Sequence, residues 1–275
     1  MEQIRTRPPI AAPAHQRARG HARVAFGPGG LRGLRQQGSG KAMLPRVHGA
    51  MPEAVFVNTC GGVTGGDRFL WELEVAAGAR ATGTTQAAER LYRASEGLGR
   101  IETRLSAGAG SVLHWLPMET ILFERCAVAR RIEVDLRDDA EFIGVETLVL
   151  GRAAHGEVLS HACFTDDWRI RRDGRLVQAE AFRLAGDLGG VLGGSATLRG
   201  IRALATLIVS APGAGDRLEG LRARLTREGV TAGASAWNGQ LVLRMHAPDH
   251  RPLKAALIEI LAWLRGAPLP RVWHM

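Results

Sequence analysis

The chain has 275 residues and a net charge of +9 at pH 7, and 45% of its residues are hydrophobic. This length suffices for one large domain or two small ones with a substantial core, and since no run of about 18 apolar residues occurs, no membrane-spanning helix is expected. The basic balance favours an acidic partner, either nucleic acid or an acidic protein surface. The cysteines Cys60, Cys126 and Cys163 form no CxxC pair, which argues against a disulfide framework and favours a reducing cytoplasm.

The N-terminal segment, residues 1–20, is rich in Arg, Pro and Ala and lacks the apolar core and cleavage site of a signal peptide. We expect a flexible arm there. No repeat of fixed period and no linker divides the remainder, so residues 21–275 are expected to form a single domain.

A glycine-rich stretch, VNTCGGVTGGDRF, covers residues 57–69. A phosphate-binding loop of the Walker type needs a lysine after its glycines and then a helix. Here Asp67 follows the glycines, and residues 69–75 alternate as in a strand, so the stretch does not predict a phosphate site. Two interpretations remain: a tight turn with positive φ at several glycines, or a loop whose backbone lies close to a partner or ion.

Apolar and polar residues alternate repeatedly from Ala54 to about Val209, which predicts strand after strand with one solvated face. Clear examples are residues 69–75, 101–105 and 132–136. Asp-Gly at positions 173 and 174 lies between two apolar runs and predicts a hairpin. Because no long helical pattern separates these strands, a parallel βαβ sheet is not expected.

A first helix is predicted near the C-terminus. Asp216 is a suitable cap for it, and Leu218, Leu221 and Leu225 would share one face before Gly229 ends it.

A second helix is predicted to begin at Pro252 and to close at Arg265-Gly266. Between the two helices, ASAWNGQLVLRMH predicts a hairpin that turns at Asn238-Gly239. The expected fold is therefore mainly β: one large strand-rich domain, with stacked or helically coiled strands and about two α-helices near the C-terminus.

The segment TTQAAERLYR carries Thr84 and Thr85, and a nucleophilic threonine needs an adjacent base. The spacing identifies no such base, so a strand lined with hydroxyl groups is the better interpretation.

A row of donor side chains follows in AAHGEVLSHAC. In an uninterrupted strand His155, Glu157, His161 and Cys163 would share one face, and their side chains would suit nickel or zinc. Ligands six residues apart on a straight strand lie about 20 Å apart, which is too far for one ion. A shared site would need a bend at Gly156 or a bulge, and isolated histidines are the alternative.

Three glutamates lie in apolar surroundings: Glu119 in LPMETILF, Glu146 in FIGVETLVL and Glu180 in LVQAEAFRL. A carboxylate on a buried strand face is unfavourable unless it is paired, hydrogen-bonded, hydrated or metal-bound. The three positions indicate either a wet internal passage or partner-facing seam, or a set of salt bridges with the many arginines. No Ser-His-Asp order, HExxH or CxxC pair is visible, so the residues give no argument for catalysis.

The motifs, taken in order, resemble the urease accessory protein D family, called H in some bacteria. They are VNTCGGVTGGD, TTQAAERLYR, HWLPMETILFE, ETLVLGRAAHGE, WRIRRDGRLVQAE, Gly-Ala-Ser at 233–235 and the ending LPRVW at 269–273. The resemblance spans roughly residues 20–274. Three positions depart from the family's pattern: Cys60 stands where Ser is usual, Met118 where Gln is usual, and His155 where Met is common.

The resemblance implies a mostly β, non-enzymatic scaffold of urease maturation in the cytoplasm, with no tightly bound cofactor. Such proteins bridge apo-urease to accessory protein F, which recruits the GTPase accessory protein G. Nickel is thought to pass to the urease active site through an internal channel in the D protein. By motif, Glu146 and Glu180 occupy acidic positions of that channel, and Asp67 is a further candidate. Neither a membrane nor nucleic acid is expected as a partner.

A nickel ion in transit needs oxygen donors strong enough to replace some of its water, but too few to trap it. Single carboxylates spaced along a wet tunnel meet that need, whereas a closed site of His and Cys would hold the ion firmly. Glu146 and Glu180 are therefore preferred to the row from His155 to Cys163. The sequence leaves open whether His155, His161, Cys60 or Cys163 binds metal.

The competing hypothesis is a basic nucleic-acid-binding β protein, for which charge is the only support. Tyr92 is the sole tyrosine, and no aromatic-rich strand offers a platform for stacking bases. A hydrolase is a third hypothesis, and it lacks a visible nucleophile–base pair.

Overall fold

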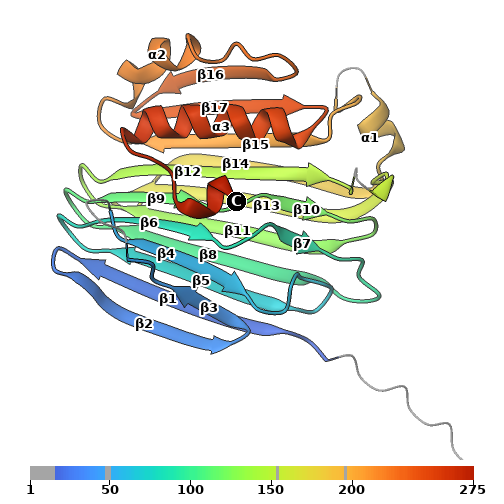
Figure 1. Cartoon of the computed structure of the whole chain (residues 1–275), viewed down its shortest axis with the longest axis horizontal. Coiled ribbons are helices and arrows are strands. Elements are labelled where there is room, and N and C mark those ends of the chain that lie inside the picture. The colour runs from blue at the N-terminus through green and yellow to red at the C-terminus, as the bar shows by residue number, and fades with distance from the viewer. Residues whose placement is uncertain (1–15, 47–50, 153–154, 195–196) are drawn as a thin grey trace, which may run out of the picture.

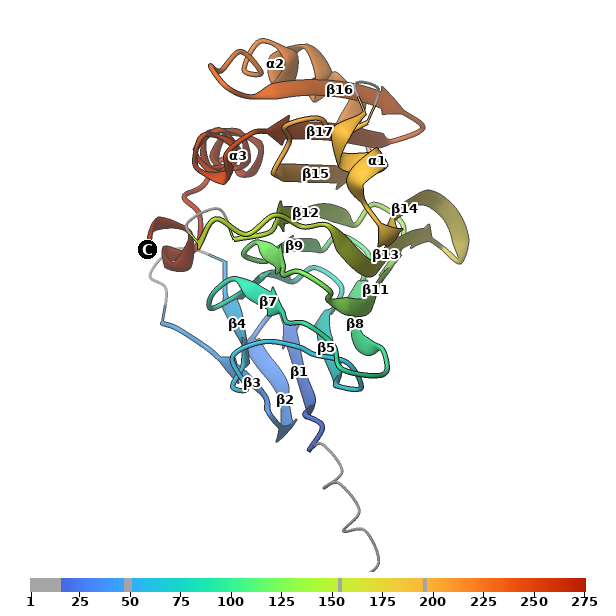
Figure 2. The ribbon, with the colours of Figure 1, turned by 90° about the vertical axis from the view of Figure 1, so that its right-hand side faces the viewer.

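The computed structural model describes residues 16–46, 51–152, 155–194 and 197–275, in which 17 strands form one sheet that folds into two facing layers (Figure 1, Figure 2). The first layer contains, in spatial order, β2 (Gly30–Gly38), β1 (Arg19–Gly27), β5 (Arg68–Val75), β8 (Gly99–Ala107), β11 (Ala127–Leu136), β13 (His161–Arg172) and β14 (Arg175–Asp187). The second layer contains β3 (Gly40–Met43), β4 (Glu53–Asn58), β6 (Arg80–Thr85), β9 (Val112–Leu116), β12 (Glu141–Leu150), β15 (Ala203–Ser210), β17 (Gln240–Ala247) and β16 (Thr231–Trp237). Two short strands, β7 (Glu89–Leu91) and β10 (Thr120–Leu122), pair with each other, and β10 also pairs with β12.

The chain winds as a coil, because from β4 to β13 its longer strands alternate between the two layers. Successive strands of one layer therefore run parallel, as in the pairs β5–β8 and β8–β11. The absence of βαβ units is confirmed in the described residues. Parallel pairing is nevertheless extensive, because two parallel neighbours in one layer are connected by a strand of the opposite layer instead of by a crossover helix.

The main core lies between the two layers and follows from the period-2 alternation of their strands. Phe56 of β4 packs against Trp71 of β5 at a ring-centroid distance of 5.7 Å and against Trp115 of β9 at 5.6 Å. These contacts join both layers, and the burial of such large rings stabilises the coil.

Beyond the coil the second layer continues through the antiparallel strands β15, β17 and β16. The long helix α3 (His250–Arg265) packs on β15 and β17, where a second core forms (Figure 1). Its buried face consists of Leu253, Ala256, Leu257, Ile260, Leu261 and Leu264. The predicted second helix is thus confirmed, although it begins two residues before Pro252.

The predicted first helix is shorter than expected. A 3-10 turn, η2 (Ala214–Arg217), precedes the α-helix α2 (Leu218–Arg222), which ends well before Gly229. A further short helix, α1 (Gly189–Gly193), has no counterpart in the sequence-based expectation. The chain ends in a second 3-10 turn, η3 (Arg271–His274).

Both predicted hairpins are confirmed. Asp173 and Gly174 have φ values of 50° and 78° between β13 and β14, and Asn238 and Gly239 have φ values of 46° and 73° between β16 and β17. Two successive positive φ values define the tight turn that matches the twist of a hairpin.

The uninterrupted strand considered for the segment from His155 to Cys163 is wrong. His155 and Gly156 lie in a turn, with Gly156 at φ 66°, and β13 begins only at His161. Most of the predicted N-terminal arm, up to residue 15, lies outside the described residues, and β1 begins at Arg19.

Candidate functional site

Glu146 projects from the middle of β12 into the space between the layers, where it is 6% exposed. Arg130 of β11 reaches it from the opposite layer, with Nη1 2.5 Å from Glu146 Oε2. The same guanidinium donates to both oxygens of Asp166 on β13, from Nε at 3.0 Å and from Nη2 at 2.6 Å. A single buried cation is therefore shared between two buried carboxylates.

Opposing effects act on the carboxylate of Glu146. Burial raises the pKa of Glu146, the positive charge of Arg130 opposes that rise, and the negative charge of Asp166 adds to it. The two carboxylates in turn raise the pKa of Arg130 further above its ordinary value. Arg130 is thus a permanent positive charge between the two carboxylates.

Glu180 lies on β14, which is the last strand of the first layer. Arg244 of β17 donates to both of its carboxylate oxygens at 2.6 Å, which links the last strand of the first layer to the second layer. Strand register explains the meeting: Glu146, Thr206 and Arg244 occupy one row across β12, β15 and β17. The side chain of Arg244 therefore extends from this row to Glu180.

Glu146 and Glu180 line one pocket of about 270 Å³, together with Asp166, Arg244 and His246. The Nδ1 atom of His246 is buried and has no hydrogen-bond partner among the described residues. The pocket thus offers three carboxylates and one free imidazole nitrogen, set beside two guanidinium groups. Such an arrangement attracts cations while limiting the net negative charge.

Glu89 on β7 is a half-buried carboxylate that the sequence analysis did not single out. Asn58 donates to its two oxygens at 3.2 Å and 3.4 Å, and burial raises its pKa to about 7, with Asn58 and Arg130 opposing the rise. It lines a small pocket of about 140 Å³ with Asn58 and Gln86. Its strand position, in phase with the buried Leu91, is the pattern that could have identified it.

Asp67 lies elsewhere, in the glycine loop between β4 and β5. It is 4% exposed and accepts the backbone N–H groups of Ala18 and Thr64, both at 2.8 Å. Gly61, Gly62 and Gly66 of the loop have positive φ values, and a Cβ at Gly62 would lie 2.3 Å from the ring of Tyr92. The loop is thus a tight packed turn, and the structure does not bring Asp67 to the pocket of Glu146.

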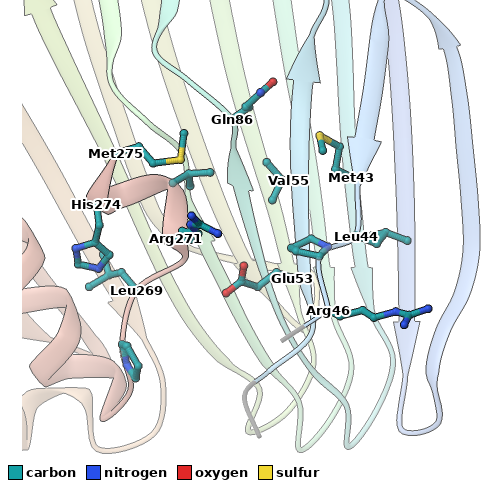
Figure 3. Close-up of a pocket in the computed structure, with 13 residues that line it drawn as sticks. Met43, Leu44, Arg46, Glu53, Val55, Gln86, Leu269, Arg271, His274 and Met275 are labelled. Atoms are coloured by element: carbon teal, nitrogen blue, oxygen red, sulfur yellow. The ribbon is translucent and has the colours of Figure 1, made fainter. Parts of the chain in front are cut away.

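A larger pocket, of about 840 Å³, lies between β3, β4 and the C-terminal turn η3 (Figure 3). Its lining is mostly apolar, with Met43, Val55 and Leu269 among its members, and Glu53 is the one acidic side chain among the described residues that line it. This lining is unlike that of a cation path.

Comparison with known proteins gives the chain its family. A family model described as UreD urease accessory protein matches residues 18–274. The chain belongs to the UreD family. Urease accessory protein UreD of Dinoroseobacter shibae is 50% identical over 96% of this chain and 95% of the relative. UreD of Cereibacter sphaeroides is 49% identical over 94% and 96%, and that of Rhizobium etli is 44% identical over 96% and 97%.

Membership in the UreD family confirms the resemblance drawn from the motifs and gives the chain a role as a urease accessory protein. The related proteins are named as accessory proteins rather than as enzymes. No helix among the described residues is both long and apolar enough to cross a membrane.

The threonines of the UreD motif TTQAAERLYR have structural partners. Thr84 donates to the backbone oxygen of Leu116 at 2.6 Å, and Thr85 accepts the backbone N–H of Met118 at 2.9 Å. These bonds agree with a strand lined by hydroxyl groups. Glu119, the third glutamate in an apolar segment, lies near His250 and Lys254 of α3, at 3.6 Å and 3.9 Å.

The soft and borderline donors of this UreD protein lie apart from one another. His161 is 3.4 Å from Glu124, Cys163 is exposed, and Cys60 donates from Sγ to Ser39 at 2.9 Å in the glycine loop. In the described parts of the chain, no three His, Cys, Asp or Glu side chains come together as a closed metal site. In the 270 Å³ pocket, Glu146 and Asp166 share the guanidinium of Arg130, whereas Glu180 pairs separately with Arg244.

Proposed function

We propose that this UreD protein is a non-catalytic scaffold that binds apo-urease and accessory protein F, and through F the GTPase accessory protein G. Nickel is its cargo and passes through its interior on the way to the urease active site. Glu146 and Glu180 line part of that path. The observation that carries the proposal is that these two glutamates, on strands of opposite layers, face one pocket.

The chemistry of the pocket suits an ion in transit. A carboxylate deep in the sandwich and another at its end offer successive oxygen ligands, and His246 adds a nitrogen donor that nickel favours. Each carboxylate is balanced by an arginine, Arg130 for Glu146 and Arg244 for Glu180. An entering ion therefore meets carboxylates whose charge is largely neutralised, which limits how firmly it is held.

Asp67 has a different part in the proposal. Both of its oxygens accept backbone N–H groups, so it holds the glycine loop in shape rather than offering a free ligand. Its contribution to nickel transfer would be indirect, through the position of that loop.

The test replaces each pocket glutamate by its neutral isostere in cells that carry the urease operon. Glu146→Gln and Glu180→Gln are expected to lower urease activity and the nickel content of purified urease by about tenfold, since a ligand is lost from the path. Both variants should still co-purify with accessory protein F and urease. The matched control is Glu133→Gln, whose carboxylate pairs with Arg131 at 2.6 Å on a more exposed face of β11.

Full urease activity with normal nickel content in both pocket variants would refute the path through this pocket. Lost activity together with lost co-purification would indicate a folding or docking defect instead, and would likewise contradict the assignment.

A further inference from the structure

Arg130 is the residue around which the interior of the pocket is organised. It is 5% exposed and contacts three polar side chains, since its Nη1 also donates to Thr120 Oγ1 of β10 at 2.8 Å. Register places Arg130 directly beside Asp166 on the neighbouring parallel strand. Its side chain then crosses the space between the layers to Glu146.

The guanidinium occupies the place that a divalent cation would take between these two carboxylates. With both carboxylates ionised, the triad of Arg130, Asp166 and Glu146 has a net charge of about −1 in a buried setting. Adding a divalent ion while Arg130 stays in place would leave an uncompensated positive charge in the interior, which is unfavourable. The ion and the guanidinium therefore compete for the same oxygens.

We infer that Arg130 is a tethered counter-cation that keeps the carboxylate pair of Glu146 and Asp166 from trapping nickel. The inference rests on the proposed function and adds to it the residue that sets how firmly the path holds its ion. A passing ion replaces the guanidinium at one or both carboxylates, and the return of Arg130 releases it. No covalent step is involved.

A purely structural ion triad is the competing explanation, and the two explanations predict different results when the positive charge is removed. If Arg130 only stabilises the fold, its loss leaves two buried carboxylates that take up protons. If Arg130 is a counter-cation to the path, its loss creates a metal site where the parent has only weak affinity.

The experiment measures nickel binding to the purified full chain by equilibrium dialysis, with NiCl₂ as the probe. Arg130→Met is expected to bind nickel about tenfold more tightly than the parent or better, because a cation adjacent to the ligands has gone. It should also retain nickel through desalting and deliver less of it to urease. The matched control is Arg131→Met, the next residue of β11, whose side chain is 58% exposed and pairs with Glu133.

A double variant, Arg130→Met with Glu146→Gln, should return nickel affinity to the level of the parent, because it removes one of the two carboxylates. A folded Arg130→Met protein with the nickel affinity of the parent would overturn the inference. If the single variant is unstable, nickel should raise its melting temperature while leaving that of the parent unchanged, and an instability that nickel does not relieve would count against the inference.

Thr120→Val supplies a second variant that keeps every charge. It removes the hydroxyl that holds Nη1, so Arg130 is expected to leave its carboxylates more easily and nickel affinity to rise severalfold. A folded Thr120→Val protein without any rise would contradict the inference even where Arg130→Met fails to fold.

The two proposals fail in different ways. If Glu146→Gln activates urease fully, the path through this pocket is wrong. If Glu146→Gln impairs activation while Arg130→Met gains no nickel, the path stands and only the role of Arg130 is lost.

Discussion

The residues in and around the pocket differ in how readily the sequence identifies them as candidates. Glu146 and Glu180 stand out because each is an isolated acid in an apolar run. Arg130 and Asp166 were missed because they lie among other charged residues, in ARRIE and TDDW. Both fall in the buried phase of their strands, as Arg130 does with Val128 and Ile132, so phase rather than polarity was the informative property.

His114 of β9 is a buried titratable residue that makes the stability of the protein depend on pH. It is 2% exposed, and its Nδ1 accepts the Nε–H of Arg265 at 3.1 Å, which requires the neutral ring. Burial and the neighbouring arginines lower its pKa from 6.5 to about 3. Below pH 6.5 the unfolded chain therefore binds a proton that the folded chain refuses, so stability falls as the pH drops from 6.5 toward 3.

His114→Asn should remove this dependence, because an amide can accept from Arg265 and does not titrate. Chemical denaturation at several pH values should show the parent losing about 1–2 kcal/mol more than the variant between about pH 6.5 and pH 5. Parallel curves for the two proteins would show that folding does not lower the pKa of the ring.

Elements defined by local chemistry were the ones that the sequence predicted well. The Asp-Gly and Asn-Gly hairpins need only two residues that accept positive φ, and α3 follows from its apolar spacing and its closing Gly266. The first helix was overestimated because Leu218, Leu221 and Leu225 fit a longer helix. A bridge between Arg227 and Val230 instead leads the chain back toward β16.

The N-terminus of α3 offers a test at the scale of one element. Asp249 has extended backbone angles, and its Oδ1 accepts the backbone N–H of Arg251 at 2.8 Å, as a helix cap does. Asp249→Ala should lower the free energy of unfolding by about 1 kcal/mol, while Asp249→Asn should retain most of it, since an amide oxygen can also cap. Equal unfolding curves for the alanine variant and the parent would mean that the cap contributes nothing.

At the scale of the whole molecule, the pocket depends on contacts that no local pattern encodes. Alternation indicates that Glu146 and Glu180 each lie on a strand, but their meeting requires β14 to end one layer opposite β17 of the other. That arrangement results from the coil, in which strands distant in sequence become neighbours. The strand content and the acidic candidates could therefore be predicted from the residues themselves. Only the resemblance to a family placed Glu146 and Glu180 along one path.

The coil itself depends on the packing between its layers, and Phe56 is the side chain that tests this. It is 1% exposed and contacts Trp71 in one layer and Trp115 in the other, at 5.7 Å and 5.6 Å between ring centroids. Phe56→Ala removes both contacts and leaves a cavity, so the free energy of unfolding should fall by about 3–5 kcal/mol. Trp237→Ala is the control, because this ring is 41% exposed at a hairpin end and its loss should change stability by less than about 1 kcal/mol.

Because Phe56 does not line the pocket of Glu146 and Glu180, its loss should lower urease activation only in proportion to the amount of folded protein. Activity per folded chain, measured by urease assay against immunoblots of the cleared lysate, should therefore stay near that of the parent, whereas Glu146→Gln should lower it at normal protein levels. A Phe56→Ala protein that keeps the stability of the parent would mean that the two layers are held by other contacts. The arrangement of the strands would then depend on the hydrogen bonds between neighbouring strands rather than on packing between the layers.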